Sequence, residues 1–145
     1  MIPAAPLTLG LAGLLPFLFA AALMLSPTIR EFAGLAEGSG RIILHLYGTI
    51  ILSFMSGTIW GFATRTHGAP AGVFYVLSVI PALWAFFCLI PQLGFDPALP
   101  LAIGFVALLP IDWAAWRQGL APEWWMRLRL LLTAVVVPCL LVSLI

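Results

Sequence analysis

The sequence predicts an all-α, polytopic membrane protein: a five-helix transmembrane bundle with a short interfacial helix after the first span. Hydrophobic residues make up 63% of the 145 residues and charged residues only 8%, whereas soluble domains carry about 25% charged residues. Five apolar stretches each reach the roughly 20 residues that cross about 30 Å of hydrocarbon. No stretch shows the alternating ten-residue pattern of barrel strands, so helices are expected to satisfy the backbone in lipid.

The five spans are expected to form a single transmembrane domain over residues 1–145. Most of the connections between them are short, which leaves no room for an extramembrane domain. The opening MIPAAPLTLG lacks the positive region of a signal peptide, so we count it with the mature chain. The expected spans are about residues 6–25, 41–63, 70–91, 98–116 and 123–145.

The first span contains Pro16, which is expected to kink the helix and free the carbonyl of Ala12. After it, Ser26 suits an N-cap, Pro27 a first helical position and Gly38 a helix end. These signals favour a short helix in the membrane interface over a plain loop.

The second span, Arg41–Ala63, is expected to be the straight central helix of the bundle. Each of the other spans carries an internal proline, and this one carries none. Small residues recur every fourth position, which places them on one ridge that another helix can approach closely. We favour coverage of this ridge from within the chain over an intermolecular contact. The ridge consists of Thr49, Ser53, Gly57 and Gly61.

Asp112 is the one acidic residue inside an apolar run, and Arg127 and Arg129 follow at a similar depth on the next span. A buried charge in lipid is costly, so an ion pair is expected. The two arginines lie about 200° apart on a helix, so only one can face Asp112 while the other reaches toward lipid phosphate. A structural ion pair is favoured over a proton or anion site.

His45 and Tyr47 lie near one end of the second span and point to different faces. His45 could titrate, bind a quinone carbonyl or ligate haem, although a packing role is favoured. Cys88 and Cys139 lie in apolar runs and are expected to be packing thiols.

Arginines near the span ends predict the orientation. A cytoplasmic N-terminus places Arg65, Arg117, Arg127 and Arg129 on the cytoplasmic side. Only two arginines, at positions 30 and 41, then lie on the periplasmic side. This modest bias predicts a cytoplasmic N-terminus and a periplasmic C-terminus, with five of the six tryptophans on the cytoplasmic side.

The chain carries little that supports catalysis. It has no HExxH motif, no acidic cluster, no Ser-His-Asp set and no phosphate-binding glycine loop, so no catalytic residue, metal or cofactor is expected. No basic stripe is present to bind nucleic acid.

These absences favour a non-enzymatic protein that packs against other integral membrane proteins in the bilayer. It would act as an accessory subunit or assembly factor of a respiratory or photosynthetic complex. The oligomeric state stays open. The alternative is a binder or transporter of a small ligand, quinone or lipid, with a site beside the second span built from His45, Tyr47, Ser53, Trp60 and Asp112. A membrane enzyme is the weakest hypothesis.

Three segments resemble a family of five-span bacterial membrane proteins of unknown function, which has a mitochondrial transmembrane relative in animals. They are LGLAGLLPF, YGTIILSFMSGTIWGF and GLAPEWWMRLRLLLTAVVV. The resemblance implies a bacterial inner (cytoplasmic) membrane and brings no established activity. Many members carry a histidine just before the tryptophan of the second span. This chain has Ile59 at that position, before Trp60, so no role of that histidine is expected in this protein.

Overall fold

The computed structural model describes residues 1–91 and 94–145, and within these ranges the chain is helical and contains no strand. Five helical stretches are long and apolar enough to cross a membrane, which confirms the predicted all-α class and the five spans. They are Ala4–Leu25, Ser39–Ala63, Gly68–Cys88, Ala98–Arg117 and Trp125–Leu144.

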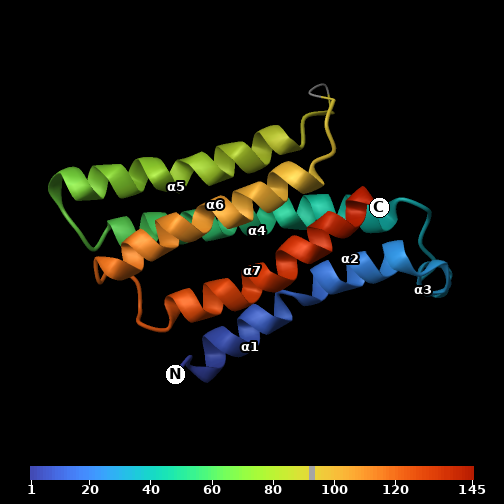
Figure 1. Ribbon diagram of the computed structural model, residues 1–145, viewed down its shortest axis with the longest axis horizontal. Coiled ribbons are helices and arrows are strands. Elements are labelled where there is room, and N and C mark those ends of the chain that lie inside the picture. Colours follow the sequence, from blue (N-terminus) through green and yellow to red (C-terminus); the bar gives the residue numbers. More distant parts are fainter. Residues whose placement is uncertain (92–93) are drawn as a thin grey trace.

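The spanning helices lie side by side along the long axis (Figure 1). The central one is α4 (Ser39–Ala63), which packs against α5 (Gly68–Cys88), α6 (Ala98–Arg117) and helix α2 (Leu15–Leu25) of the first span. The last span, α7 (Trp125–Leu141), packs mainly against α6 and continues into the 3-10 helix η2 (Val142–Leu144).

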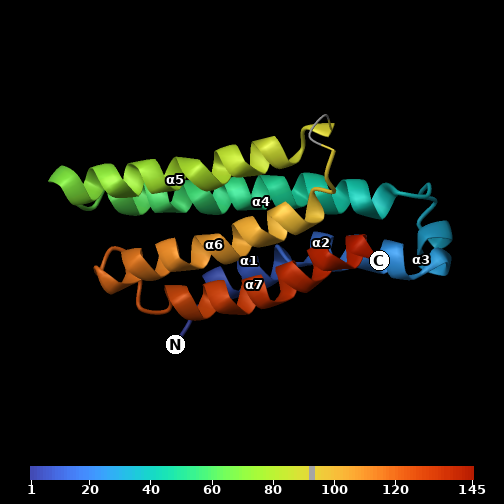
Figure 2. The ribbon, with the colours of Figure 1, turned by 45° about the horizontal axis from the view of Figure 1, so that its top comes forward.

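The two ends of the bundle differ in what they contain. The N-terminus lies at the same end as the α4–α5 and α6–α7 connections, and the short helix α3 (Pro27–Phe32) and the C-terminus lie at the other end (Figures 1 and 2). Arg65 Nη1 donates to the carbonyl of Leu120 at 2.7 Å, which ties the two connections together.

The first span is broken into two helices, α1 (Ala4–Ala12) and α2 (Leu15–Leu25). The sequence predicted a kink that frees the carbonyl of Ala12. The structure instead interrupts the helix at residues 13–14 and restarts it with Pro16 in the first turn of α2. The Tyr47 hydroxyl of α4 donates to the carbonyl of Gly13 at 3.1 Å, so the break has a partner across the bundle.

The break changes which helix each half of the span contacts. α2 packs closely against α4, whereas α1 packs against α7 and makes no comparable contact with α4. The first half of the span therefore diverges from the central helix.

The short helix after the first span is α3 (Pro27–Phe32), as Ser26 and Pro27 predicted. The predicted helix end at Gly38 was wrong, because α3 ends at Phe32 and Gly38 directly precedes α4. The Ser26 hydroxyl accepts a hydrogen bond from the Ile29 N–H at 3.4 Å, and Pro27 occupies the first turn. Phe32 and Ile29 are exposed, which suits a helix lying in the membrane interface.

Gly104 of α6 lies close to side chains of α4 and α5. A Cβ atom at Gly104 would lie 2.6 Å from Leu52 Cδ2 and 3.0 Å from Trp84 Cδ1. Because such distances are shorter than van der Waals contact, a larger residue at position 104 would require the side chains of Leu52 and Trp84 to shift. Leu52 and the α6 residues Leu101, Phe105 and Leu108 are fully buried there.

Pro81 lies inside α5 without ending the helix. The Ser78 hydroxyl donates to the carbonyl of Tyr75 at 2.7 Å, and Ser56 of α4 donates to the carbonyl of Ser78. The second contact fastens α5 to α4 in the bundle interior.

Candidate functional site

A cavity of about 330 Å³ lies between α1, α4 and α7 and is here called the lateral cavity. Its volume falls at the lower end of the range for small-molecule sites, roughly 300–1,000 Å³. Most of its lining is apolar, and the lining residues come from five helices (α1, α2, α4, α6 and α7) and from the break in the first span. They include Leu9, Ile51, Phe54, Phe105, Leu132 and Val136.

The broken first span creates this cavity. Gly10 of α1 fits so closely on α7 that an added Cβ would lie 3.3 Å from both Leu128 and Leu132. Because α1 leans on α7 and diverges from α4, the space between α1 and α4 is left unfilled.

The cavity opens between α1 and α4. Leu9 on α1 is 74% exposed and Phe54 on α4 is 65% exposed, and both line the cavity. Because both helices are candidate membrane spans, the opening faces the lipid side of the bundle.

A buried ion pair lies beside the cavity. Arg129 Nε donates to Asp112 Oδ2 at 2.6 Å, and Trp125 Nε1 donates to Asp112 Oδ1 at 2.8 Å. Asp112 is 0% and Arg129 2% exposed. Arg129 Nη1 also lies 2.9 Å from Met55 Sδ on α4. Contacts with α6 and α4 thus hold the guanidinium of this α7 residue in place.

Two polar atoms beside the cavity are left without a partner. Arg129 Nη2 and Thr133 Oγ1 are closed to solvent and have no hydrogen-bond partner within the described residues, and both residues line the cavity. They lie one turn apart on the same face of α7. An unsatisfied buried polar group costs about 1–3 kcal/mol, so a bound acceptor would be stabilising here.

The two arginines of α7 lie in different environments. Arg129 is buried against Asp112, whereas Arg127 is exposed on the surface of the bundle. The calculated separation of about 200° accounts for this difference.

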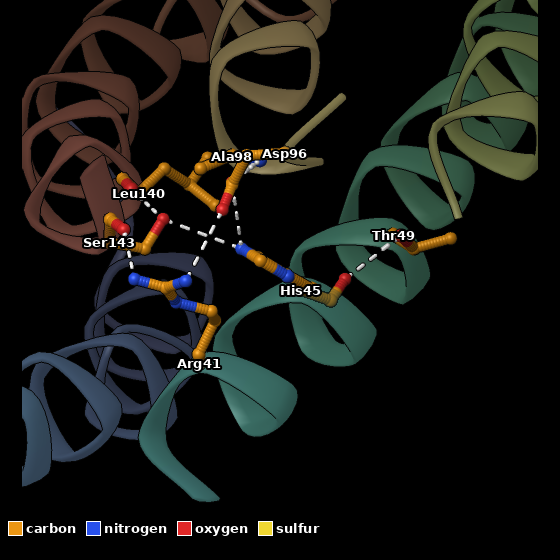
Figure 3. A network of polar contacts seen from close by, with 7 residues as sticks. All are labelled: Arg41, His45, Thr49, Asp96, Ala98, Leu140 and Ser143. Carbon is orange, nitrogen blue, oxygen red and sulfur yellow. Dashed lines mark hydrogen bonds and ion pairs between the residues drawn. The ribbon is translucent and has the colours of Figure 1, made fainter. Parts of the chain in front are cut away.

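His45 belongs to a polar network at the end of the bundle opposite the N-terminus (Figure 3). Its Nε2 lies 3.4 Å from Ser143 Oγ and 3.5 Å from Asp96 Oδ1. Arg41 donates to the carbonyl of Ser143 at 2.8 Å and lies 3.7 Å from Asp96 Oδ2. The network joins the start of α4 to the residues just before α6 and to η2, so it holds these three segments together at this end of the bundle.

The structure does not gather the residues expected to form a ligand site. Tyr47 contacts the break at Gly13, and Trp60 packs edge-on against Tyr75 of α5 with ring centroids 4.7 Å apart. His45, Ser53 and Trp60 are not among the residues that line the lateral cavity.

The small-residue ridge of α4 is covered only in part. Thr49 and Ser53 are half-buried, and the Thr49 hydroxyl donates to the carbonyl of His45 at 2.9 Å. Gly57 and Gly61 are exposed, and an added Cβ at either would meet nothing within 4 Å. The described residues therefore leave this half of the ridge free.

No group of histidine, cysteine and acidic side chains within residues 1–91 and 94–145 could hold a metal ion. Cys88 and Cys139 are both free and buried. The candidate site is thus an apolar cavity with hydrogen-bonding groups on one wall.

Thr133, Met55 and Trp125 were not identified from the sequence. Trp125 and Thr133 each lie four residues from Arg129, so they share its helix face. This four-residue spacing is the sequence signal that could have placed both residues beside Arg129. Met55 carries no comparable signal, because its role depends on how α4 meets α7.

Substituting Asp112→Leu is expected to lower the free energy of unfolding by about 3–5 kcal/mol, because it leaves Arg129 buried without a counter-charge. The double variant Asp112→Leu/Arg129→Met should recover most of that loss, since it removes both charges. Unfolding in mixed detergent micelles measures both. The exposed Arg127→Met is the control, and equal stability of Asp112→Leu and Arg127→Met would contradict the structural pair.

Comparison with known proteins places this chain in a family. The model for a protein of unknown function, DUF3429, matches residues 2–145. Transmembrane protein 69 of Xenopus tropicalis is 35% identical over 146 residues, which cover 99% of this chain and 54% of that protein. The chain thus spans about half the length of this curated relative. No solved structure matches the chain. Since the family model covers almost every residue, the chain belongs to the DUF3429 family of multi-pass membrane proteins of unknown function.

Proposed function

We propose that the protein binds one apolar, lipid-soluble molecule in the lateral cavity, without catalysing a reaction on it. The observation that supports this proposal is the cavity itself, which is apolar, opens toward lipid and has a fixed guanidinium on its wall. Of the two functions expected from the sequence, the geometry favours the binder of a quinone or lipid over the packing subunit.

A cavity-filling substitution tests this proposal. Ile51→Trp places a larger side chain in the cavity, so the purified protein should retain less of its bound molecule. Ile50→Trp is the matched control, because Ile50 is the next residue, is exposed and does not line the cavity. Mass spectrometry of molecules released from each purified variant measures the occupancy. Equal occupancy in both variants, or none in the wild type, would contradict the proposal.

A second function, association with a transmembrane helix of another protein, is favoured by the uncovered half of the ridge. Gly57 and Gly61 lie one turn apart and leave open space above the α4 backbone. A close approach of a second helix there would gain van der Waals contact, which drives helix association in lipid. An accessory subunit or assembly factor of a larger membrane complex would use such a surface.

Leucine at both ridge glycines should block this association while the fold is kept, because the new side chains meet nothing in the protein. Gly72→Leu is the matched control, since it introduces leucine at an open glycine of α5. Co-purification from native membranes in mild detergent reads out the partners. A wild-type protein that purifies alone, or a Gly57→Leu/Gly61→Leu variant that retains every partner of Gly72→Leu, would contradict the helix-packing function.

We also propose that the N-terminal end of the bundle faces the cytoplasm of a bacterium. The support is the charge pattern, since Arg65, Arg117 and Arg127 lie at this end and Arg30 and Arg41 near the other.

Cysteine labelling tests the orientation. His67→Cys in the α4–α5 connection should resist a membrane-impermeant maleimide in intact spheroplasts and react after lysis. Glu37→Cys, in the connection before α4, should react in both. Both positions are exposed in the structure. The reverse pattern would overturn the proposed orientation.

A further inference from the structure

We propose that the lateral cavity recognises a neutral carbonyl group carried on an apolar chain, and that Arg129 and Thr133 donate to its oxygen. This inference rests on the binding function proposed above and assigns the chemistry of the ligand. The shared chemistry is a carbonyl acceptor, which a quinone ring and the ester of a diacyl lipid both supply.

The first step of the argument is the identity of the unpartnered atoms. Nη2 of Arg129 is a donor only, and the Thr133 hydroxyl can donate. Neither has a partner within the described residues, and neither touches solvent. Buried polar groups in native proteins are nearly always hydrogen-bonded, so an acceptor on a bound molecule would complete the contacts of these two groups.

The second step is the charge of the wall. The carboxylate of Asp112 already balances Arg129 through a contact of 2.6 Å between Nε and Oδ2. An anionic ligand would add an unbalanced negative charge to an apolar environment, which is costly. A neutral acceptor satisfies the free N–H groups and leaves the pair balanced. A carbonyl therefore fits better than a carboxylate or phosphate.

The third step is the position of the two groups. Thr133 lies eight residues after Trp125, at the start of α7, which corresponds to about 12 Å along a helix axis. The donors thus lie well inside the span, next to the apolar side chains of Leu132 and Val136. The polar group of the ligand would enter deeply, and its chain would extend past Leu9 and Phe54 into the bilayer.

The ion pair explains why the unpartnered nitrogen stays available. Nε is held by Asp112, and Nη1 lies 2.9 Å from the sulfur of Met55. These contacts fix the orientation of the guanidinium plane. Arg129 is therefore a binding residue whose position depends on Asp112.

The test uses the full chain in nanodiscs of dialkyl ether lipids, which contain no ester carbonyl. Decylbenzoquinone and decylbenzene are added in turn, because they share a chain and differ in the carbonyl groups. A second arm replaces the ether lipid by the diester lipid of the same chain length. A ligand that binds the folded state raises the unfolding temperature in a concentration-dependent way, which yields its affinity.

We expect a carbonyl-bearing molecule, the quinone or the diester lipid, to stabilise the protein more than its carbonyl-free counterpart. Thr133→Val removes one donor at nearly constant shape, and it should weaken the carbonyl-bearing molecule roughly fivefold, the equivalent of one ordinary hydrogen bond. Its effect on decylbenzene should be negligible. The unliganded variant should unfold at the same or a higher temperature, because it loses an unsatisfied hydroxyl.

The possible outcomes distinguish carbonyl recognition from the more general proposal that the cavity binds an apolar molecule. Binding that Ile51→Trp blocks, but that ignores both the carbonyl and Thr133→Val, would overturn carbonyl recognition while leaving the binding function intact. The absence of any binding, with Ile51→Trp indistinguishable from Ile50→Trp, would overturn both. A response to the quinone arm alone or to the diester arm alone supports the inference and identifies the source of the carbonyl.

Discussion

The buried pair between Asp112 and Arg129 is the interaction on which the rest of the bundle depends. It lies inside two candidate spans, where an isolated charge would be costly. It links α6 to α7, and the contact of Arg129 with Met55 adds α4. Because the carboxylate also accepts from Trp125, its orientation is fixed by two donors. The pair therefore sets both the rotation of α7 and the direction of the free guanidinium nitrogen.

The broken first span supplies the other half of the site. In lipid, helices gain no hydrophobic drive to associate, so a helix that diverges is not forced back onto its neighbour. Tyr47 satisfies the carbonyl at the break, and Gly10 holds α1 close to α7. The space left beside α4 is the lateral cavity. The break in the first span, which is a feature of the fold, thus also produces the proposed binding cavity.

Hydropathy and caps predicted the spans and the interfacial helix because these depend on local sequence. The angular separation of Arg127 and Arg129 predicted that only one could pair. It did not predict which, since the rotation of α7 depends on the turn after α6 and on packing. The same holds for α4, because the sequence does not show which of its residues meet the cavity, and His45, Ser53 and Trp60 are not among those that line it. Pro16 indicated a distortion, but the direction in which α1 diverges is a tertiary property.

The most direct test of a ligand in the lateral cavity is photo-crosslinking in native membranes. Benzoylphenylalanine in place of Phe54, at the cavity opening, should yield one dominant adduct mass that corresponds to a carbonyl-bearing lipid-soluble molecule. The same group in place of Ile50 on the exposed surface of α4 should yield the mixture of bulk lipids. The same mixture of adducts at both positions would contradict the account.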